Sequence, residues 1–353
     1  MKEVKKLKIG ITHGDINGIG CEVILKTLSD TRILELFTPV VYSSPKVIAY
    51  YRKALGLNNL TTYSIRSAGE AQDNRINVVN CLTEEVRVEM GKSTPHGGEA
   101  AMASLKAIVA EMKAGLLDAL VTAPINKFNI QSEKFNFPGH TEYLQSEFEA
   151  GEVLMLMTGG SLRMGILTGH VPLSRVPELV TREKLASTIR LLNQTMLEDF
   201  KINRPRIAVL SLNPHAGDNG LLGDEEQTTI IPAIAEIKKE GILAFGPYPS
   251  DGFFGSDNYR KFDAVLAMYH DQGMTAFKTL CFDNGVNYTA GLPVVRTSPA
   301  HGTAYDITGK DLASSESFRQ ALYMACDITK NRMEYRSLQN NAMKEIEVKQ
   351  GED

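Results

Sequence analysis

The sequence predicts an α/β protein of two lobes built on a mostly parallel sheet. Short aliphatic runs recur along the chain, and each is followed by a turn and then by a helical pattern. This alternation is typical of a parallel sheet covered by helices. The length of 353 residues favours two lobes, and no repeat, low-complexity segment or Gly/Ser linker separates them. We therefore expect the lobes to share a continuous sheet or to exchange strands.

The predicted elements follow from these runs. Two stretches, 99–115 and 182–200, are predicted as amphipathic helices, and the first spaces its apolar residues at three and four. The chain becomes polar after about Lys330, so we expect it to fray there. The predicted strands are KIGIT (8–12), ALVTA (119–123), RMGILT (163–168), RIAVLSL (206–212) and DAVLAM (263–268).

Composition argues against several classes of protein. A formal net charge of −4 gives no electrostatic reason to bind nucleic acid or an anionic membrane. No stretch approaches the ~18 consecutive apolar residues of a membrane span, and the opening MKEVKKLK is not followed by the apolar run of a signal peptide. The four cysteines lie far apart with no Cys-x-x-Cys pair, which is typical of reduced thiols. The sequence therefore predicts a cytoplasmic protein.

Two glycine-rich segments match nucleotide-binding motifs only in part. GDINGIG (14–20) follows the first strand and precedes a helical pattern, but its glycines do not give Gly-x-Gly-x-x-Gly, so the Rossmann fingerprint is absent. GKST (91–94) ends like a phosphate-binding loop, but Val86 stands where such a loop needs glycine. A dinucleotide site of the Rossmann kind and an ATPase are thus both rejected.

Three of the seven histidines follow apolar strands closely. His170 ends RMGILTGH, His215 ends RIAVLSLNPH and His270 ends DAVLAMYH. Open α/β sheets place their ligand sites at the carboxyl ends of strands, so these side chains are candidates to meet in space. Imidazoles are common ligands of divalent metals, and three of them leave positions open for substrate oxygens. Separations of 45 and 55 residues demand a tertiary site, and loop or capping histidines remain the alternative.

Further polar residues lie in similar loops. Asp271 directly follows His270 and is a candidate orienting partner or proton acceptor. In FPGHTEYL, a turn at Pro138 and Gly139 is expected to present His140 and Thr141. Cationic and amide donors suited to a phosphate or carboxylate gather downstream, although solvated surface charge is the alternative for them: Lys278, Asn287 and Arg296.

Taken together, seven segments resemble the 4-hydroxythreonine-4-phosphate dehydrogenase family of pyridoxal phosphate biosynthesis. The resemblance covers roughly residues 8–335. The family's first loop usually reads GDPAGIGPE, where this chain has Ile16 and Cys21 in place of prolines. The segments are GDINGIG (14–20), TAPINK (122–127), PGHTEYL (138–144), TGHVPLS (168–174), LNPHAGDNG (212–220), MYHDQG (268–273) and GLPVVRTSPAHGTAYDITG (291–309).

The resemblance implies a two-lobed fold like that of isocitrate and isopropylmalate dehydrogenases, with a central cleft. Lobe one would comprise residues 1–130 with 280–353, and lobe two residues 131–279. It also implies a homodimer that shares one divalent metal (Zn, Mg or Co) on His170, His215 and His270. The phosphorylated substrate would be bound by His140, Thr141, Lys278, Asn287 and Arg296.

A nicotinamide cofactor site is expected in HGTAYDITGK (301–310), which is similar to the adenosine-binding loop of isopropylmalate dehydrogenases. NAD or NADP would contact His301, Gly302, Thr303 and Asp306, while Asp271 and Lys278 would serve catalysis.

The expected reaction is oxidation of 4-phosphooxy-L-threonine at C3, followed by decarboxylation to 3-amino-2-oxopropyl phosphate. A divalent cation would lower the cost of ionising the hydroxyl group. Dehydrogenases of 4-phospho-D-threonate or 4-phospho-D-erythronate stay open as alternatives. So do a metal-dependent hydrolase, a non-catalytic phosphate-binding protein and, by fold analogy alone, an acyltransferase.

Overall fold

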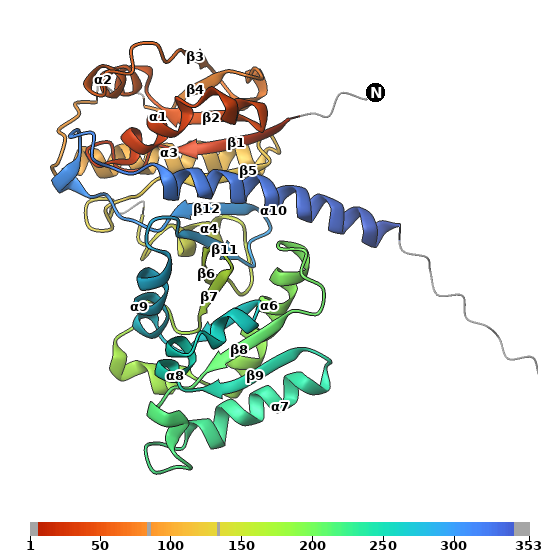
Figure 1. The fold of residues 1–353 in the computed structure, drawn as a ribbon. Helices are drawn as coiled ribbons and strands as arrows, with labels where there is room; N and C mark the ends of the chain where they lie inside the picture. Colours follow the sequence, from red (N-terminus) through yellow and green to blue (C-terminus); the bar gives the residue numbers. More distant parts are fainter. Residues whose placement is uncertain (1–5, 83–85, 133–134, 342–353) are drawn as a thin grey trace, which may run out of the picture.

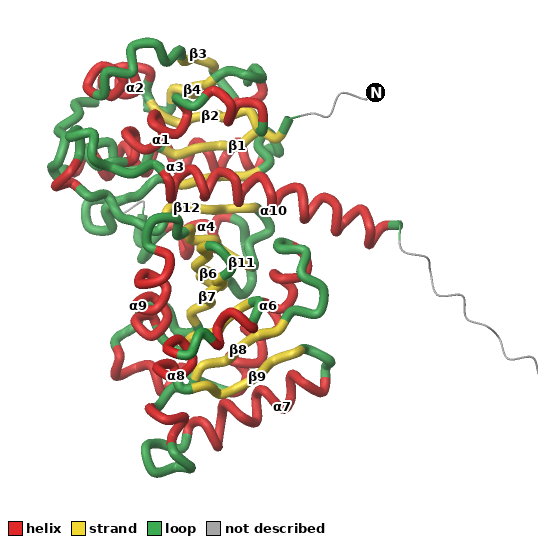
Figure 2. Tube along the Cα trace, in the orientation of Figure 1, coloured by secondary structure: helices red, strands yellow, loops and turns green. Residues whose placement is uncertain are grey.

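A computed structural model describes residues 6–82, 86–132 and 135–341. Twelve strands form one sheet in the order β3-β4-β2-β1-β5-β12-β11-β6-β7-β10-β8-β9, with helices on both faces (Figures 1 and 2). No helix in the described ranges has the length and apolarity to cross a membrane. The strands are β1 (Leu7–Thr12), β2 (Phe37–Ser43), β3 (Thr62–Ile65), β4 (Ile76–Asn80), β5 (Ala119–Thr122), β6 (Leu154–Gly159), β7 (Leu162–Ile166), β8 (Arg206–Leu210), β9 (Leu243–Tyr248), β10 (Ala264–Ala267), β11 (Val286–Ala290) and β12 (Val295–Pro299).

The part of the sheet from β3 to β12 is parallel throughout. Alternate residues of β1 point to opposite faces: Ile9 and Ile11 are buried in the core that includes α1 and α10, whereas Gly10 faces Ile108 of α3. The α-helices are α1 (Gly20–Leu28), α2 (Pro45–Ala54), α3 (Pro95–Lys113), α4 (His140–Glu147), α5 (Val176–Leu179), α6 (Arg182–Glu198), α7 (Ile231–Lys239), α8 (Ser250–Gly255), α9 (His270–Cys281) and α10 (Glu316–Asn340).

The sheet continues without a break into the other half of the molecule. β11 pairs antiparallel with both β12 and β6, and β6 pairs antiparallel with β7. From β7 the strands β10, β8 and β9 are parallel again. Helices α6 and α7 pack in the large core on one face, and α8 and α9 contribute to a separate core on the other. The expected mostly parallel, continuous sheet is confirmed, while the exact lobe boundaries stay a prediction.

The three strands that precede the candidate histidines are neighbours. β10 lies between β7 and β8 and is parallel to both, so the chain leaves all three at the same edge of the sheet. The five predicted strands and both predicted helices are present, with ends that differ by up to four residues.

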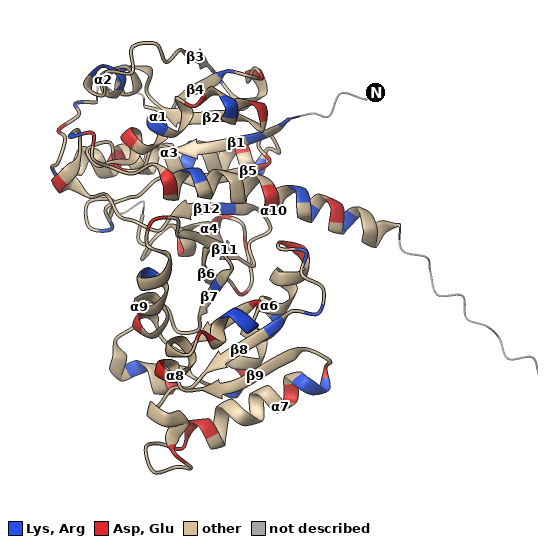
Figure 3. Ribbon diagram, in the orientation of Figure 1, with Lys and Arg blue, Asp and Glu red and all other residues tan. Residues whose placement is uncertain are grey.

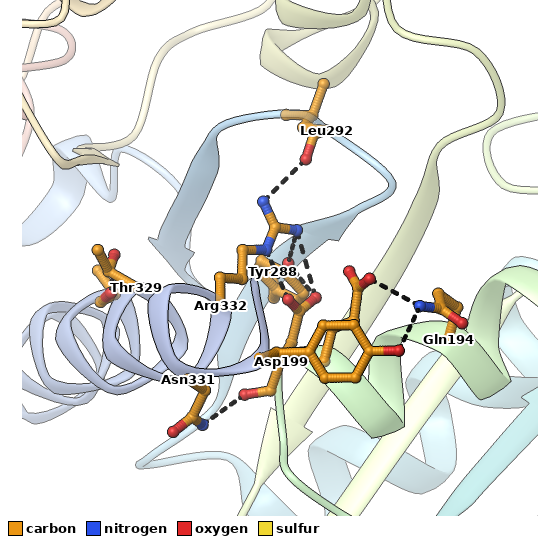
Figure 4. A network of polar contacts seen from close by, with 10 residues as sticks. Gln194, Asp199, Tyr288, Leu292, Thr329, Asn331 and Arg332 are labelled. Carbon is orange, nitrogen blue, oxygen red and sulfur yellow. Dashed lines mark hydrogen bonds and ion pairs between the residues drawn. The ribbon is translucent and has the colours of Figure 1, made fainter. Parts of the chain in front are cut away.

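The C-terminal part differs from its expectation. The chain is still helical beyond Lys330, because α10 continues to Asn340, and the fraying expected for residues 342–353 lies outside the described residues. Basic and acidic residues alternate along its exposed side (Figure 3), which explains its polar sequence. The buried Arg332 nevertheless anchors the helix, since its guanidinium bonds to Asp199, to the Tyr288 hydroxyl and to the Leu292 carbonyl (Figure 4).

Candidate active site

A cavity of about 290 Å³ lies against the central strands β5, β12, β11 and β6 and reaches the histidines after β7 and β10. It collects most of the side chains predicted from the sequence. His215, Asp271, Thr303 and Asp306 are not among the residues that line it. The predicted residues that do line it are His140, Thr141, His170, His270, Lys278, Asn287, Arg296, His301 and Gly302.

Arg296 is a buried cation in the wall of this cavity. Its side chain rises from β12 and is held by two hydroxyl groups: Nε and Nη2 donate to Thr122 Oγ1 at 3.1 and 2.7 Å, and Nη1 donates to Thr289 Oγ1 at 3.0 Å. Within the described residues, no carboxylate forms an ion pair with it. Burial lowers its pKa to about 10, so it stays charged at neutral pH. The charge of Glu142, which lines the same cavity, offsets part of this burial without an ion pair, and an anionic ligand would offset more of it.

Further hydrogen-bonding groups surround Arg296. Asn287, on the neighbouring β11, has a buried Oδ1 without a hydrogen-bond partner. His140 and Thr141 begin α4, where Gly139 brings the chain in with an extended backbone. Burial lowers the pKa of His140 well below its usual value, and the charges of Arg296 and Lys127 add to this effect. The His140 ring is therefore neutral and able to hydrogen-bond an anion through one N–H.

His170 and His270 approach each other across the cavity, with ring centroids 5.2 Å apart. His270 Nδ1 lies 2.7 Å from Asp271 Oδ1, a contact that orients the ring and leaves Nε2 available. Burial lowers the pKa of His170, followed by the effects of Lys127 and His270. The neutral form of imidazole is the one that binds divalent metals.

His215 is exposed and is not among the residues that line this cavity. Residues 215–220 all have positive φ, with His215 at 52° and Ala216 at 54°, a conformation that non-glycine residues adopt rarely. Among the described residues of one chain, no group of three His, Cys, Asp or Glu side chains is placed to hold a metal. Of the three histidines predicted to bind a metal, one copy of the chain therefore brings His170 and His270 to the cavity, whereas His215 lies outside its lining. Two neutral imidazoles this close are donors that fit a divalent metal, although they do not complete its coordination.

A second cavity of about 390 Å³ adjoins the first, because Lys278, Ala300, His301 and Gly302 line both. Most of its wall is apolar, including Ile19, Phe277 and Ile307. Of the four residues predicted to contact the cofactor, two line this space, while Thr303 and Asp306 lie in the same loop but outside the lining.

The loop that carries His301 packs on the first glycine-rich loop. Ile19 N donates to Thr303 O at 2.9 Å, and a Cβ on Gly18 would come within 2.8 Å of that oxygen. The buried Asp15 accepts from the Tyr305 hydroxyl at 2.7 Å. Ile16 and Cys21, at the two positions where the resemblance led us to expect prolines, are fully buried, so packing contacts surround both positions.

Several residues of the first cavity were not predicted. Lys127 lies in TAPINK and Glu142 follows His140 and Thr141, so a closer reading of these two segments would have found them. The methionines of the wall carry no signal that separates them from core residues. The residues missed are Thr122, Lys127, Glu142, Met155, Met157, Met274 and Ser298.

Comparison with known proteins identifies the family of this chain. The family described as "Pyridoxal phosphate biosynthetic protein PdxA" matches residues 35–325. A protein from Bacteroides thetaiotaomicron named 4-hydroxythreonine-4-phosphate dehydrogenase is 53% identical over 344 residues, which cover 97% of this chain and 94% of that protein.

Solved structures give the same result for the fold. A crystal structure of 4-hydroxythreonine-4-phosphate dehydrogenase from Klebsiella pneumoniae is similar with a TM-score of 0.78 and 32% identity, covering 93% of this chain and 99% of that one. Isocitrate dehydrogenase from Methylococcus capsulatus, with a TM-score of 0.50 and 10% identity, covers 95% of this chain and 89% of that one and shares the fold alone.

Proposed function

This chain belongs to the PdxA family of pyridoxal phosphate biosynthetic proteins, and from that premise we propose that it oxidises 4-phosphooxy-L-threonine at C3. Hydride passes to NAD or NADP and a proton is released, which gives a β-keto acid. Loss of carbon dioxide then leaves 3-amino-2-oxopropyl phosphate.

The observation that carries the proposal is the buried Arg296, which forms no ion pair among the described residues, in a cavity that also holds the His170–His270 pair. The N–H groups of Arg296 not used by Thr122 and Thr289 are available to the substrate phosphate. His140, Thr141, Lys278 and Asn287 supply further hydrogen bonds to it. A phosphate fixed at one end places the C3 hydroxyl at a set distance from the histidines.

We assign one divalent cation (Zn, Mg or Co) to His170 and His270 of one copy and His215 of a second copy in a homodimer. When bound, such a cation lowers the cost of ionising a hydroxyl group. The contact between Asp271 and His270 supports an orienting role for Asp271. Lys278 lines both cavities, so we assign it the proton transfer between substrate and solvent.

The cofactor is assigned to the second cavity and the loop 301–306. Its apolar wall suits a planar ring, and its opening toward the first cavity beside His301 would allow hydride transfer over a short distance. The reaction needs no nucleic acid or membrane, and we place it in the cytoplasm.

The decisive experiment mixes the protein with a divalent metal, NAD or NADP and each of three substrates: 4-phosphohydroxythreonine, 4-phosphothreonate and 4-phosphoerythronate. Absorbance of reduced nicotinamide reports oxidation, and a phosphate assay reports hydrolysis. We expect the highest kcat/KM with 4-phosphohydroxythreonine. A higher kcat/KM with 4-phosphothreonate or 4-phosphoerythronate would change the substrate assignment. Release of phosphate without reduced cofactor would establish the hydrolase instead.

A further inference from the structure

A chain of hydrogen bonds joins the three strand ends that carry His170, His270 and His215. We propose that Gln272 and Glu226, the central members of this chain, are positioning residues that set where the three imidazoles stand. The inference rests on the proposed metal site, but it concerns side chains that line neither cavity.

The first link connects β7 with β10. Leu167 N donates to Ala267 O at 2.9 Å, which continues the parallel ladder by one residue. Thr168 Oγ1 then donates to Met268 O at 2.8 Å in a buried position. Because His170 and His270 each lie two residues beyond these groups, the link fixes the start of both histidine segments.

Gln272 makes the second link, between β10 and β8. Its Oε1 accepts from Met268 N at 2.7 Å, on its own side of the junction. Its Nε2 donates to Ser211 O and to Ser250 Oγ, both at 2.7 Å. One amide group thus connects the start of the helix that carries His270 to the segment that leads to His215. Both of its N–H donors and one of its two acceptor positions are used.

Glu226 makes the third link, beneath the His215 loop. Its fully buried carboxylate accepts from Leu212 N at 2.8 Å and from Asn213 N at 2.7 Å through Oε1, and from Asn213 Nδ2 at 3.0 Å through Oε2. No cation among the described residues forms an ion pair with it, so these three N–H groups are what offsets its burial. It belongs to a single π-helical turn, Glu226–Ile230, a rare conformation enriched at functional sites.

The left-handed run at 215–220 explains why such anchoring is required. Consecutive non-glycine residues in this region are strained, and strain of this kind persists only where surrounding contacts impose it. Glu226 holds the two residues before Pro214 and approaches Gly217, where a Cβ would come within 2.7 Å of its Oε2. This carboxylate therefore fixes the backbone on either side of His215, through Leu212 and Asn213 before it and Gly217 after it.

The test compares variants of these two residues with matched controls. Gln272→Leu removes all three bonds at similar size, and Gln272→Glu keeps the acceptor for Met268 N but loses both donors. Glu226→Gln keeps one carbonyl but sets an N–H₂ against Asn213 Nδ2. The controls are Gln320→Leu and Glu236→Gln, because Gln320 bonds only within α10 and Glu236 pairs only with exposed arginines of α6.

The measurements are the affinity for Co²⁺, followed by its visible absorption, and turnover as a function of metal concentration. Each of the three variants should bind Co²⁺ roughly 10- to 100-fold more weakly, as is typical when partners behind metal ligands are lost. Turnover should recover at high metal, and KM for the nicotinamide cofactor should not change. Thermal unfolding identifies any variant that fails to fold, and Gln272→Glu is retained as the mildest change.

Two results would overturn the inference in different ways. If the wild type binds metal and turns over, but folded variants of Gln272 and Glu226 bind Co²⁺ within twofold of the wild type, the positioning role is wrong and the proposed function stands. If the wild type binds no divalent metal at all, the proposed metal site fails and the inference falls with it.

Discussion

Arg332 of α10 and Asp199 at the end of α6 form a buried ion pair, with Arg332 Nε 2.6 Å from Asp199 Oδ1 (Figure 4). The same carboxylate accepts from the Tyr288 hydroxyl. The pair joins the C-terminal helix, which packs on β12 and β5, to a helix of the other half of the sheet.

Replacing Arg332 by Met should destabilise the protein by about 3–5 kcal/mol, because Asp199 would stay buried without its cation. Unfolding in urea measures the change. Arg336→Met is the control, since Arg336 is exposed on the same helix, and it should stay within about 0.5 kcal/mol of the wild type. Equal effects of the two variants would contradict the structural role of the pair.

Arg296→Lys should raise KM for the phosphorylated substrate by roughly 10- to 100-fold. A lysine ammonium cannot reproduce the planar contacts with Thr122 and Thr289 and still reach the ligand, and hydrogen bonds to charged groups contribute about 1.5–3 kcal/mol. KM for the cofactor should not change. An unaltered substrate KM would mean that the anion binds elsewhere.

Mixing two inactive variants tests whether the site is shared. His215→Ala and His270→Ala should each lose metal and turnover while remaining folded. In a mixed dimer one site would combine an intact His170–His270 pair with an intact His215. After subunit exchange we expect about a quarter of wild-type activity, since half of the dimers are mixed and each has one complete site. Full activity of His215→Ala alone, or no recovery despite exchange, would argue against a shared site.

Because His13 is buried, we expect the protein to lose stability as the pH falls below about 6.5. It is fully buried behind β1, and burial lowers its pKa to about 3, against a smaller opposite effect from the backbone of Tyr42. The His13 ring takes up a proton near pH 6.5 in the unfolded chain but not in the folded one. The free energy of unfolding therefore keeps its full value above pH 6.5 and decreases as the pH falls toward 3.

Unfolding free energies of wild type and His13→Gln measure this effect. Between about pH 7.5 and pH 5 the wild type should lose about 2 kcal/mol more than the variant. Parallel pH profiles for the two proteins would show that His13 is not held neutral in the folded state.

Much of the fold could be predicted because its central strands are aliphatic runs with clear ends. The placement of His170 and His270 followed from the rule that strand ends carry ligand sites. The strand order β7-β10-β8 shows that the strands before all three histidines are neighbours in the sheet. Seven of the twelve described strands were not predicted: β2, β3, β4, β6, β9, β11 and β12. Of these, β6 and β11 are the ones that a parallel pattern could not reveal. They cross the middle of the sheet antiparallel to their neighbours, and the pattern of helix after strand gives no sign of them.

Two features depend on contacts distant in sequence and were beyond prediction. The left-handed backbone at residues 215–220 follows two residues whose N–H groups are bound by Glu226, and nothing in LNPHAGDNG alone specifies these angles. The polar C-terminal helix is anchored by Arg332, whose side chain binds the buried carboxylate of Asp199, 133 residues away in the sequence. In both cases one buried residue makes contacts that favour the observed conformation of a segment, whereas the composition of that segment predicts a loop or a frayed end.

The pairing of β11 with β6 constrains how the molecule can move. Five consecutive residue pairs, from Val286 with Thr158 to Ala290 with Leu154, bond the two halves through the floor of the first cavity. Two domains joined by a flexible linker can rotate as rigid bodies. Here, rotation of one half of the sheet relative to the other would have to twist the hydrogen-bonded pair of strands β11 and β6. We therefore expect ligand access to depend on bending of the sheet and on the loops around its rim, with little change in the spacing of β12 and β6 on either side of β11.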